Sequence, residues 1–355
     1  MSAETVAPTL VQVVPAGPGG VRDHAAVLQA TWALCGRPSH VIELSQQAAA
    51  AEPLSMKLQR LQARPDQPLS LLLHFSGYGY HPRGLCGWLL PQLQAARESL
   101  GPQLRVVVLF HELFASGPPW RSAFWLAGRQ AGIARRLAQA ADAVLTNTDH
   151  HAAWLRRRLP ADTLLHVQPV FSNIGEPACV PAPQERRPEL IVFGSASTRS
   201  RALARLPRHA NDLRALGIER VIEVGPPGVT PVMPAGMAHH HAGRLPQVEL
   251  GALLQTVRYG LIDYPSVHLG KSGVFAAYAA QGCVVLNTAS PGPDADGLRA
   301  GLHYLSLTHP QHRGMPGQSH AFARAAELRT WYLGHTATQQ GAEVAALLDG
   351  LMRVP

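Results

Sequence analysis

Lysine is almost absent from this basic chain. Only Lys57 and Lys271 occur among its 31 lysine and arginine residues, so arginine carries nearly all of the net charge of +8. No apolar run approaches the roughly 20 residues that a membrane-spanning helix needs. Charged residues make up 15% of the 355 residues and hydrophobic residues 46%, which excludes a disordered chain and indicates a large buried core. At this length we expect two domains.

Cysteine and aromatic residues are also scarce. The four cysteines lack CxxC and CxxH spacing, which predicts reduced thiols and neither a disulfide framework nor a zinc site. The first residues lack a basic segment followed by an apolar stretch and a cleavage site, so we expect a cytoplasmic protein. Aromatic residues amount to 6% and do not alternate with basic ones, which argues against a nucleic-acid partner. The positive charge favours nucleotide phosphates, acidic glycans or an anionic membrane face.

Short apolar runs alternate with helix-length segments in the first half of the chain. Unbroken runs of leucine and β-branched residues, without strict alternation, predict strands buried on both faces of a parallel sheet. The strand candidates are LVQVVP (10–15), HVIEL (40–44), LSLLLHF (69–75), RVVVLFHEL (105–113), DAVLTNT (142–148) and LLHVQPVF (164–171).

The second half repeats this pattern after a proline-rich stretch, EPACVPAPQERRPE (176–189), whose composition is typical of a linker. A long helical stretch from about Ser319 to Met352 closes the chain. The alternation predicts an α/β fold with two Rossmann-like domains. The strand candidates of this half are ELIVFGS (189–195), RVIEV (220–224), YGLIDY (259–264) and CVVLNT (283–288).

Glycines and polar side chains follow several first-half strands. The turn PAGPGGVRD (15–23) places Gly19 and Gly20 where glycine lets a phosphate or a sugar approach the backbone; a plain tight turn is the alternative. His111 and Glu112 follow another strand, and a histidine there could bind a sugar hydroxyl or move a proton near neutral pH. The alternative is a histidine that only bonds nearby backbone. Further candidate sugar or acceptor contacts are His74, Tyr78, Arg83, Trp120 and Asn173. For the glycine-rich segment 73–84, a structural loop is the alternative.

Arginines occur near the start of the first helix of the second half. The segment FGSASTRSRA (193–202) contains Arg199 and Arg201. Positive side chains are unfavourable at a helix start unless an anion compensates, so the pair predicts a diphosphate contact. Three adjacent histidines (239–241) cannot all face one ion, and we expect a solvated loop there. Three arginines (156–158) predict a solvated or membrane-facing patch.

The stretch HLGKSGVF (268–275) is similar to part of a phosphate-binding P-loop. The complete motif needs a glycine five residues before Gly270, and Pro265, which has no N–H, occupies that position. A P-loop ATPase is therefore disfavoured. Lys271 instead precedes a segment, FAAYAA, that is apolar on every face, so we expect a buried helix whose start alone faces solvent. A positively charged helix start is suited to phosphate.

In their order and spacing these segments resemble the GT-B glycosyltransferases, especially the retaining family-4-type group that carries the glycosyltransferase family 1 domain. The matching segments are PAGPGGV, HEL after a strand, TNT before a helix, FSNIGEP, FGSASTR and LIDYPSVHLGKSGVFAAYAAQGCVVL. The resemblance implies two Rossmann-like domains that face each other across a cleft, with the last helix crossing back to the first. The implied bounds are 1–175 for an acceptor domain, 176–188 for a linker, 189–320 for a nucleotide-sugar domain and 321–355 for a C-terminal helical segment.

The chain departs from that group at the Glu-x7-Glu pair that contacts the donor, because its positions are Leu269 and Ala277 here. The donor base and sugar, and the choice between retention and inversion, stay open. The resemblance implies hexosyl transfer from a GDP- or UDP-sugar to a glycan or lipid-linked acceptor, in bacterial surface polysaccharide or glycoconjugate synthesis. It also implies peripheral contact with an anionic membrane at its inner face. A non-catalytic sugar- or nucleotide-binding protein on the same scaffold is the alternative.

The implied chemistry needs no metal and no cofactor besides the nucleotide sugar. Protein cations and helix starts could stabilise the negative charge of a leaving diphosphate. No DxD motif follows a strand, and Asp294-Ala-Asp296 lies in a Pro/Gly-rich segment. The expected catalytic residues are His111 and Glu112, which are the candidate bases if the reaction inverts configuration. The expected donor-binding residues are Gly19, Gly20, Gly194, Ser195, Arg199, Arg201, Lys271, Ser272 and Gly273.

Overall fold

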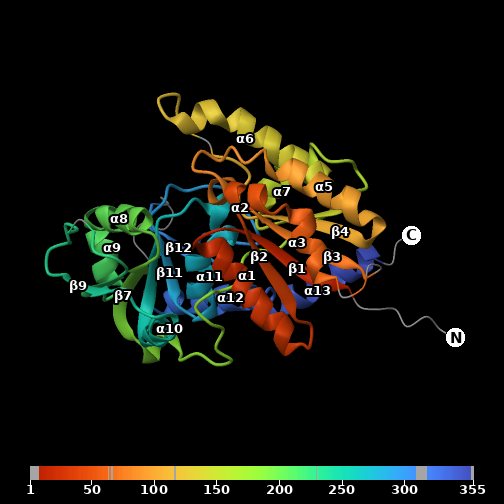
Figure 1. The fold of residues 1–355 in the computed structure, drawn as a ribbon. Helices are drawn as coiled ribbons and strands as arrows, with labels where there is room; N and C mark the ends of the chain where they lie inside the picture. Colours follow the sequence, from red (N-terminus) through yellow and green to blue (C-terminus); the bar gives the residue numbers. More distant parts are fainter. Residues whose placement is uncertain are drawn as a thin grey trace. The chain divides into compact units, whose positions relative to one another are not determined.

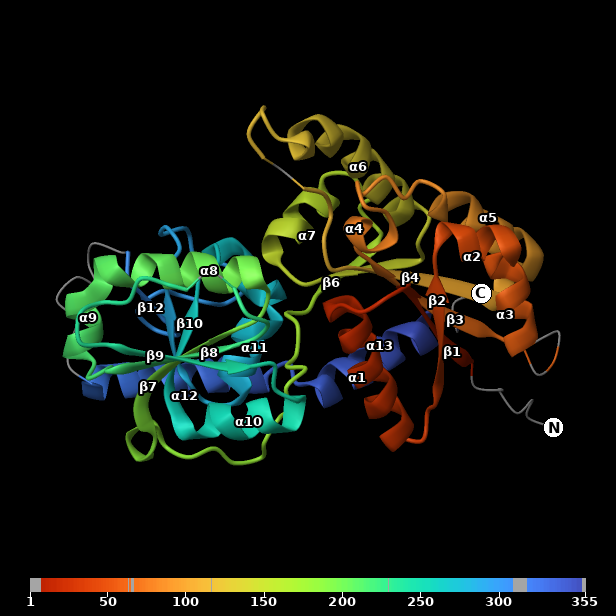
Figure 2. The ribbon, with the colours of Figure 1, turned by 60° about the vertical axis from the view of Figure 1, so that its left-hand side comes forward.

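The chain forms two compact units, each with its own parallel sheet. A computed structural model describes residues 8–352 apart from 63, 65, 66, 116, 229 and 309–317. The first unit comprises Met1–Gln168 and Ala337–Pro355, and the second Pro169–Thr336. Each unit contains a sheet of six strands, and all neighbouring strands in both sheets are parallel (Figure 1, Figure 2). The predicted α/β class with parallel sheets is therefore confirmed.

The sheet of the first unit has the strand order β2-β1-β3-β4-β5-β6. Its strands are β1 (Thr9–Pro15), β2 (Ser39–Leu44), β3 (Leu69–Phe75), β4 (Leu104–Phe110), β5 (Ala143–Thr146) and β6 (Leu164–Val167). Its helices are α1 (Gly20–Leu34), α2 (Gln46–Ala51), α3 (Leu54–Leu61), α4 (Gly77–Tyr80), α5 (Leu89–Leu100), α6 (Ser122–Gln139), α7 (Asp149–Arg156) and, from the end of the chain, α13 (Ala337–Met352).

Burial of continuous apolar runs accounts for these strands. Every residue of β3 is buried, and so are all residues of β4 except Arg105. The two strands pair from Leu69 with Leu104 to Phe75 with Phe110, so they end at the same level. His111 and Glu112 thus directly follow β4.

The sheet of the second unit reads β9-β8-β7-β10-β11-β12. Its strands are β7 (Arg187–Phe193), β8 (Arg220–Val224), β9 (Ala238–Gly243), β10 (Val257–Ile262), β11 (Val284–Asn287) and β12 (Leu305–Ser306). Its helices are α8 (Ala196–Arg205), α9 (Ala210–Ala215), α10 (Gln247–Thr256), α11 (Gly273–Ala280) and α12 (Gln318–Leu333), with short 3-10 turns η3 (Leu206–His209) and η4 (Ser266–Lys271).

The apolar segment after the GKSG sequence forms α11, in which Phe275 to Ala280 are all buried. The helix packs in the core cluster that also contains Ile191 and Ile262 of the sheet. The hydroxyl of Tyr278 donates hydrogen bonds to the backbone oxygens of Ile191 (3.0 Å) and Leu261 (3.1 Å). The expectation of a buried helix is confirmed, and this helix connects the loop after β10 to β11.

The closing helical stretch, expected from about Ser319 to Met352, consists of two helices. α12 ends at Leu333 and α13 begins at Ala337, after Gly334 interrupts the helix. In the first unit α13 lies beside α1, as both ribbon views show (Figure 1, Figure 2). The indole of Trp32 donates to the Gly341 oxygen at 2.7 Å, and a further link is the Arg37–Asp349 ion pair.

The three adjacent histidines also differ from their expectation, because they belong to strand β9 at the edge of the second sheet. His239 lies 3.1 Å from the Glu223 carboxylate of β8, while His240 and His241 are exposed. The arginines at 156–158 are exposed as expected, and the Arg158 guanidinium lies 4.1 Å over the Trp154 ring. None of the described helices is long and apolar enough to span a membrane.

The packing of α13 on α1 predicts opposite effects of leucine at two glycines of α13. Gly341 is buried, and a Cβ there would lie 3.0 Å from the Thr31 methyl group, whereas a Cβ at Gly350 would meet nothing within 4 Å. Gly341→Leu should lower the free energy of unfolding by about 1–3 kcal/mol through overpacking. Gly350→Leu should raise it by about 0.5 kcal/mol, because leucine favours a helix more than glycine does. Urea denaturation of both variants checks this, and equal shifts would contradict the packing described.

Candidate functional site

Each sheet has one point at which the strand order reverses. In the second unit, β8 and β9 lie on one side of β7, and the strands that follow them in the chain, β10 to β12, lie on the other side. In the first unit, the corresponding point lies between β1 and β3. Open α/β sheets bind ligands outside the carboxyl ends of the strands at such switch points, because the loops diverge and leave a crevice. The polar residues at these two edges are therefore the candidates for function.

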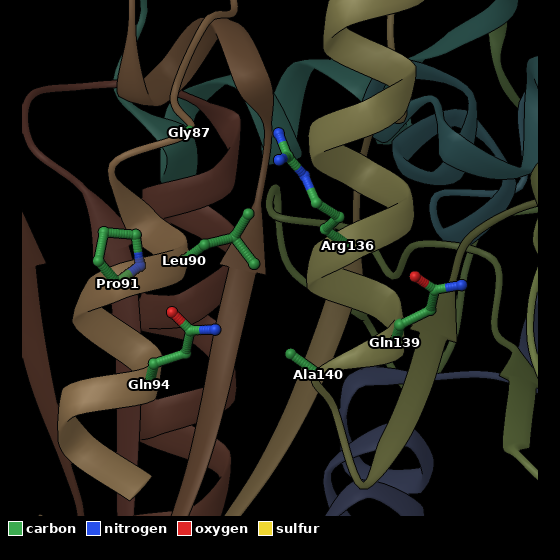
Figure 3. Close-up of a pocket in the computed structure, with 7 residues that line it drawn as sticks. All are labelled: Gly87, Leu90, Pro91, Gln94, Arg136, Gln139 and Ala140. Carbon is green, nitrogen blue, oxygen red and sulfur yellow. The ribbon is translucent and has the colours of Figure 1, made fainter. Parts of the chain in front are cut away.

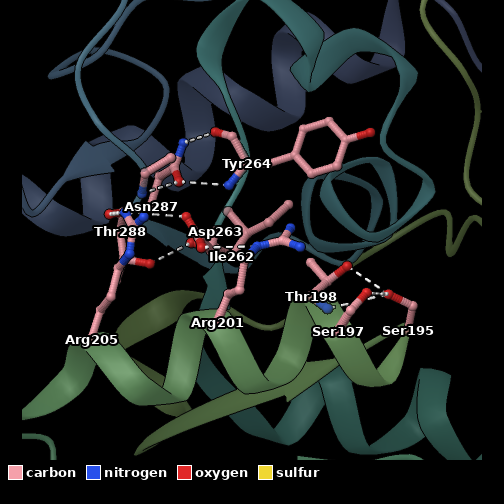
Figure 4. Close-up of polar contacts among 11 residues, drawn as sticks. Ser195, Ser197, Thr198, Arg201, Arg205, Ile262, Asp263, Tyr264, Asn287 and Thr288 are labelled. Atoms are coloured by element: carbon pink, nitrogen blue, oxygen red, sulfur yellow. Dashed lines mark hydrogen bonds and ion pairs between the residues drawn. The ribbon is translucent and has the colours of Figure 1, made fainter. Parts of the chain in front are cut away.

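A cavity of about 470 Å³ lies at the switch point of the second sheet. Three segments form its wall: helix α8, the loop after β10 and the loop after β11. The polar contacts around it are drawn in Figure 4. The lining residues are Arg201, Arg205, Asp263, Pro265, Ser266, Val267, Ala289, Ser290, Pro291, Gly292 and Pro293.

Two arginines and one carboxylate set the charge of this cavity. The buried Asp263 carboxylate lies 3.3 Å from Arg201 Nε and 3.3 Å from Arg205 Nη1. The Arg201 side chain keeps 53% of its surface exposed, so most of its donors face solvent. Since two positive groups share one negative group, the cavity wall carries a net positive charge suited to an anion.

Asn287, the last residue of β11, holds the two loops of the cavity together. Its Oδ1 accepts hydrogen bonds from the backbone N–H groups of Tyr264 (3.2 Å) and Ala289 (3.0 Å). Its Nδ2 donates to the Tyr264 oxygen at 2.8 Å, and the Thr288 N–H donates to the Ile262 oxygen at 2.9 Å. These bonds within the protein fix the loop geometry, so the cavity is preorganised.

Ser266 offers the cavity an unused polar group. The residue is 7% exposed and lines the cavity, yet its Oγ has no hydrogen-bond partner among the described residues. A buried hydroxyl without a partner costs free energy, and native structures rarely keep one unless water or a ligand satisfies it. Ser266 is therefore suited to contact a bound polar molecule.

Three hydroxyl side chains lie close together at the start of α8. Ser195 caps the helix, since its Oγ accepts the Thr198 N–H at 3.3 Å, and it lies 2.6 Å from Thr198 Oγ1 and 3.2 Å from Ser197 Oγ. Figure 4 shows the three side chains at one end of the helix, on the side of Arg201. The neighbouring Gly194 has φ +111°, and a Cβ there would lie 2.9 Å from the Val274 side chain, so glycine is required by packing.

Arg199 differs from Arg201 and corrects the prediction that both contact a diphosphate. The Arg199 side chain is 1% exposed, and its Nε pairs with the buried Glu223 at 2.9 Å. Its other nitrogens donate to the backbone oxygens of Gly194 (2.7 Å) and Pro226 (2.5 Å). All three guanidinium nitrogens of Arg199 thus donate to protein groups. Arg199 is therefore a structural residue that holds α8 to the sheet.

The GKSG segment does not form a phosphate-binding loop. Local bonds close the backbone of η4 at both ends: the His268 N–H donates to the Pro265 oxygen and the Ser272 N–H to the Leu269 oxygen. The Gly270 N–H donates to the Asp296 carboxylate at 3.3 Å. These N–H groups are unavailable to a phosphate, so the structure argues against a P-loop ATPase.

Four predicted residues lie at or near the start of α11. Ser272 is buried and caps the helix by accepting the Phe275 N–H at 3.2 Å, so its hydroxyl is used structurally. Asn173 lies beside Gly273, since a Cβ at that glycine would be 3.8 Å from Asn173 Oδ1. Lys271 is half-buried at the end of η4 and does not line the cavity described above.

Histidines occupy the switch point of the first sheet. His74 ends β3, His111 follows β4, and His24, which the sequence had not suggested, lies in the first turns of α1. His74 Nδ1 lies 3.1 Å from His111 Nε2, and the ring centroids of His24 and His111 are 5.0 Å apart. His74 is completely buried, which corrects its prediction as a sugar contact, whereas His111 is half-buried.

The side chain of Gln12 on β1 orients the His74 ring. Gln12 Nε2 donates to the Ala25 oxygen (3.1 Å) and to Ser39 Oγ (3.2 Å), so Oε1 is turned toward His74 Nε2 at 2.9 Å. His74 must carry its proton on Nε2, and Nδ1 presents a lone pair toward His111. Burial lowers the pKa values of His24 and His74 well below their usual range, and the neighbouring His111 lowers them further. Both imidazoles are neutral at pH 7.

Other predicted residues of the first unit lie around this edge. The Glu112 side chain is exposed, with one carboxylate oxygen 3.4 Å from Ser76 Oγ. The Tyr78 hydroxyl lies 3.2 Å from Gln130 Nε2, which also donates to the Arg83 backbone oxygen. Arg83 and Trp120 are exposed.

The glycine turn before α1 is open. Gly20 begins the helix and Gly19 caps it, and a Cβ at either position would meet nothing within 4 Å. The packing of this turn therefore does not require a glycine, and the backbone at the helix start is accessible. Such a surface allows close approach of a ligand, as the sequence predicts.

A second cavity, of about 480 Å³, lies between helices α5 and α6 of the first unit (Figure 3). Arg136 is the one charged residue among its lining, which otherwise consists of Gly87, Leu90, Pro91, Gln94, Gln139 and Ala140. It lies along the helices and away from the strand ends. Its chemistry offers no group for catalysis.

Four residues near the carboxyl ends of the strands were not predicted from the sequence: His24, Arg205, Asp263 and Ser266. Asp263 directly follows a buried strand, and Ser266 lies three residues further along the same loop. A position just after a strand is the signal that pointed to His111. Arg205 lies four residues after Arg201, one helical turn later on the same face, so the periodicity of α8 could have identified it. His24 had no such signal, because nothing in the sequence connects α1 to β3.

Comparison with solved structures identifies the fold. No protein-family model matches the sequence, and no curated protein matches it at a significant level. The chain is similar to the UDP-forming α,α-trehalose-phosphate synthase from Burkholderia vietnamiensis, with a TM-score of 0.61 and 13% identity over 99% of this chain and 100% of that one. The enzyme from Burkholderia multivorans gives 0.59 and 14% over 98% and 99%. An α-glucosyltransferase solved with UDP and DNA gives 0.60 and 10% over 97% and 100%.

These structures are glycosyltransferases, and they cover nearly the whole of this chain. At such low identity the similarity establishes the fold. The two sheets of six parallel strands match those structures, so the fold is the α/β fold of GT-B glycosyltransferases.

Proposed function

We propose that this protein is a glycosyltransferase that transfers a sugar from a nucleotide-sugar donor to an acceptor. The observation that carries the proposal is the preorganised, positively charged cavity at the switch point of the second sheet. Its position, charge and unsatisfied Ser266 hydroxyl suit a nucleoside diphosphate group. The solved structures of the same fold are named for UDP-dependent reactions or for complexes with UDP, which supports a UDP-sugar as the donor.

The cavity would serve catalysis through its charge. When the sugar leaves, negative charge develops on the diphosphate, and preorganised cations lower the barrier most effectively where they are already in place. Arg201 supplies such a cation, since much of its side chain faces solvent and Asp263 fixes its orientation. We propose Lys271, at the other end of η4, as a further contact to the diphosphate or the sugar.

The acceptor would bind at the carboxyl edge of the first sheet. Tyr78, Arg83 and Trp120 provide polar or aromatic surfaces for it. Gly19 and Gly20 stay proposed as donor contacts, because their open turn leaves the backbone at the helix start accessible. If the reaction inverts configuration, a base must take the acceptor proton, and His111 and Glu112 are the proposed candidates. If it retains configuration, the leaving diphosphate can take that proton.

The finer assignment to the retaining family-4-type group is also a proposal. At the positions of the missing glutamates, Leu269 and Ala277 are both buried, which removes carboxylates from the donor side. This observation favours the second candidate function, a non-catalytic sugar- or nucleotide-binding protein. Incubation with a panel of UDP- and GDP-sugars together with glycan and lipid-linked acceptors, with mass-spectrometric detection of released nucleotide, separates the two. Binding of a sugar nucleotide without nucleotide release in the presence of every acceptor would contradict the enzyme.

Arg201 and Arg199 give a matched pair of predictions on one helix. Arg201→Ala should weaken UDP binding by about 1–2 kcal/mol, the range for a charged hydrogen bond reduced by solvent screening. Its stability should change by less than about 1 kcal/mol, because half of the Arg201 side chain is exposed and Asp263 keeps its ion pair with Arg205. Arg199→Ala should lower the free energy of unfolding by about 3 kcal/mol or more, because it leaves the buried Glu223 without its cation. Calorimetric titration with UDP and urea denaturation measure the two effects.

The reverse pattern would contradict this assignment. If Arg199→Ala folded normally and lost UDP affinity while Arg201→Ala bound UDP like the wild type, the diphosphate would lie on the Arg199 side. If neither variant changed the affinity, the cavity at this edge would not be the donor site.

Because arginine side chains already supply positive charge at the proposed donor site, we predict that nucleotide release does not depend on magnesium or manganese. A metal that bridges the diphosphate needs carboxylate ligands, but Asp263 already pairs with two arginines. Nucleotide release in buffer depleted of these ions should therefore match the rate with millimolar Mg²⁺ or Mn²⁺ added. A rate that rises by about tenfold or more with either ion would show that a metal shares the charge of the leaving group.

We further propose that the start of α6 contacts an anionic membrane that carries a lipid-linked acceptor. Trp120, Phe124 and Trp125 are exposed by 82%, 46% and 72%. The exposed Arg121 and Arg129 accompany them. Exposed aromatic residues beside arginines suit the interface of an anionic bilayer, where aromatic rings insert and cations bind the headgroups. Among the described residues, no other two aromatic side chains beside arginines are exposed to this extent.

Binding to vesicles tests this surface. Trp120→Ala/Trp125→Ala should reduce co-sedimentation with phosphatidylglycerol-rich vesicles several-fold, while UDP affinity remains unchanged. Leu34→Ala is the control, because Leu34 is 90% exposed at the end of α1 and lies outside the surface. Equal binding of wild type and double variant would remove the membrane from the proposed function.

A further inference from the structure

The histidines at the edge of the first sheet form a cluster with three ligand atoms. One nitrogen each from His24, His74 and His111 lies within 4.8 Å of the other two. The side chains come from α1, the end of β3 and the residue after β4, so three elements of the core hold them. Among the described residues, this is the group of histidine, cysteine and acidic side chains close enough to share a metal ion.

We propose that His24, His74 and His111 bind a zinc ion. Tetrahedral zinc binds imidazole nitrogens at about 2.0–2.1 Å, which places two ligand nitrogens about 3.3 Å apart. The distance of 3.1 Å between His74 Nδ1 and His111 Nε2 is already close to this value. The longest separation within the cluster, at most 4.8 Å, requires a shift of about 1.5 Å, which a small side-chain rotation supplies.

The surroundings of His74 match those of a metal ligand. Metal-bound histidines usually donate their second ring N–H to a fixed acceptor, which sets the tautomer and the ring orientation. Gln12 does this for His74: its Nε2 is committed to Ala25 and Ser39, so its Oε1 can only accept. The lone pair of His74 Nδ1 is thereby directed into the cluster. Gln12 is a positioning residue in this arrangement.

The ion has a route to the cluster and a free coordination position. His24 and His74 are buried, but His111 is half-buried at the surface of the sheet edge. Three histidines occupy three positions of a tetrahedral ion and leave the fourth for water or a substrate oxygen. A ligand set of imidazoles alone suits zinc better than magnesium or calcium, which prefer oxygen ligands.

The zinc site does not depend on the proposed function, because it is argued from the first unit alone. It revises the expectation that the chain has no metal site, which rested on the lack of CxxC, CxxH and DxD motifs. Should the protein be a glycosyltransferase, His111 would be a zinc ligand and Glu112 would remain as the base. The predicted independence from magnesium concerns the donor cavity of the second unit and does not bear on this site.

Zinc binding to the full-length protein tests the proposal. The metal-free protein should bind one equivalent of Zn²⁺ by equilibrium dialysis with elemental analysis, and its melting temperature should rise with zinc. Co²⁺ should give the intense visible bands of a tetrahedral site. His111→Gln and His24→Gln should weaken zinc binding by more than about 100-fold, and Gln12→Leu by about 10–100-fold. The bands should disappear in the two histidine variants.

Two controls make the result decisive. His240→Ala/His241→Ala removes exposed histidines of β9 that could bind metal adventitiously, and it should keep the tight equivalent and the Co²⁺ bands. His151→Gln removes a buried histidine outside the cluster and should also keep both. Metal-free melting curves of each variant show whether it folds. Loss of binding in the β9 variant, or wild-type protein without stoichiometric zinc and Co²⁺ bands, would overturn the proposal.

Discussion

The parallel arrangement of the strands is the constraint on which the rest of this protein depends. Parallel strands buried on both faces must be connected by helices, so every loop after a strand opens at one edge of the sheet. In the second unit this edge gathers α8, Asp263 and Asn287 from three separate segments. In the first unit it gathers three histidines from α1, β3 and β4. The apolar runs thus build the core and, as a consequence, position the polar chemistry.

Arginine, which replaces lysine almost everywhere in this chain, shows two contrasting uses at the donor edge. Arg199 directs its planar guanidinium to a carboxylate and two backbone oxygens inside the protein. Arg201 pairs with Asp263 and keeps 53% of its side chain exposed. Because the guanidinium carries several N–H donors, a buried arginine can hold structural elements together, and an exposed arginine can bind an anion. The burial of the group, and not its charge, decides between these roles.

The sequence predicted the elements well where long apolar runs dominate, as in β3, β4 and α11. It failed where the outcome depends on orientation or on distant partners. Arg199 and Arg201 look equivalent in sequence, but two residues turn a helix by about 200°, so they lie on opposite faces of α8. His239 to His241 carry no apolar signal, yet pairing with β8 makes them an edge strand. The histidine cluster joins three elements that only the strand order of the first sheet brings together.

Hydrogen–deuterium exchange with and without UDP tests the central claim, that the switch point of the second sheet binds the nucleotide. The account predicts slower exchange on UDP addition at the start of α8, in the loop from 263 to 271 and in the loop from 288 to 293. Exchange in β8, β9 and the helices α5 and α6 should stay unchanged. Protection confined to other segments, or no protection at saturating UDP, would contradict the account.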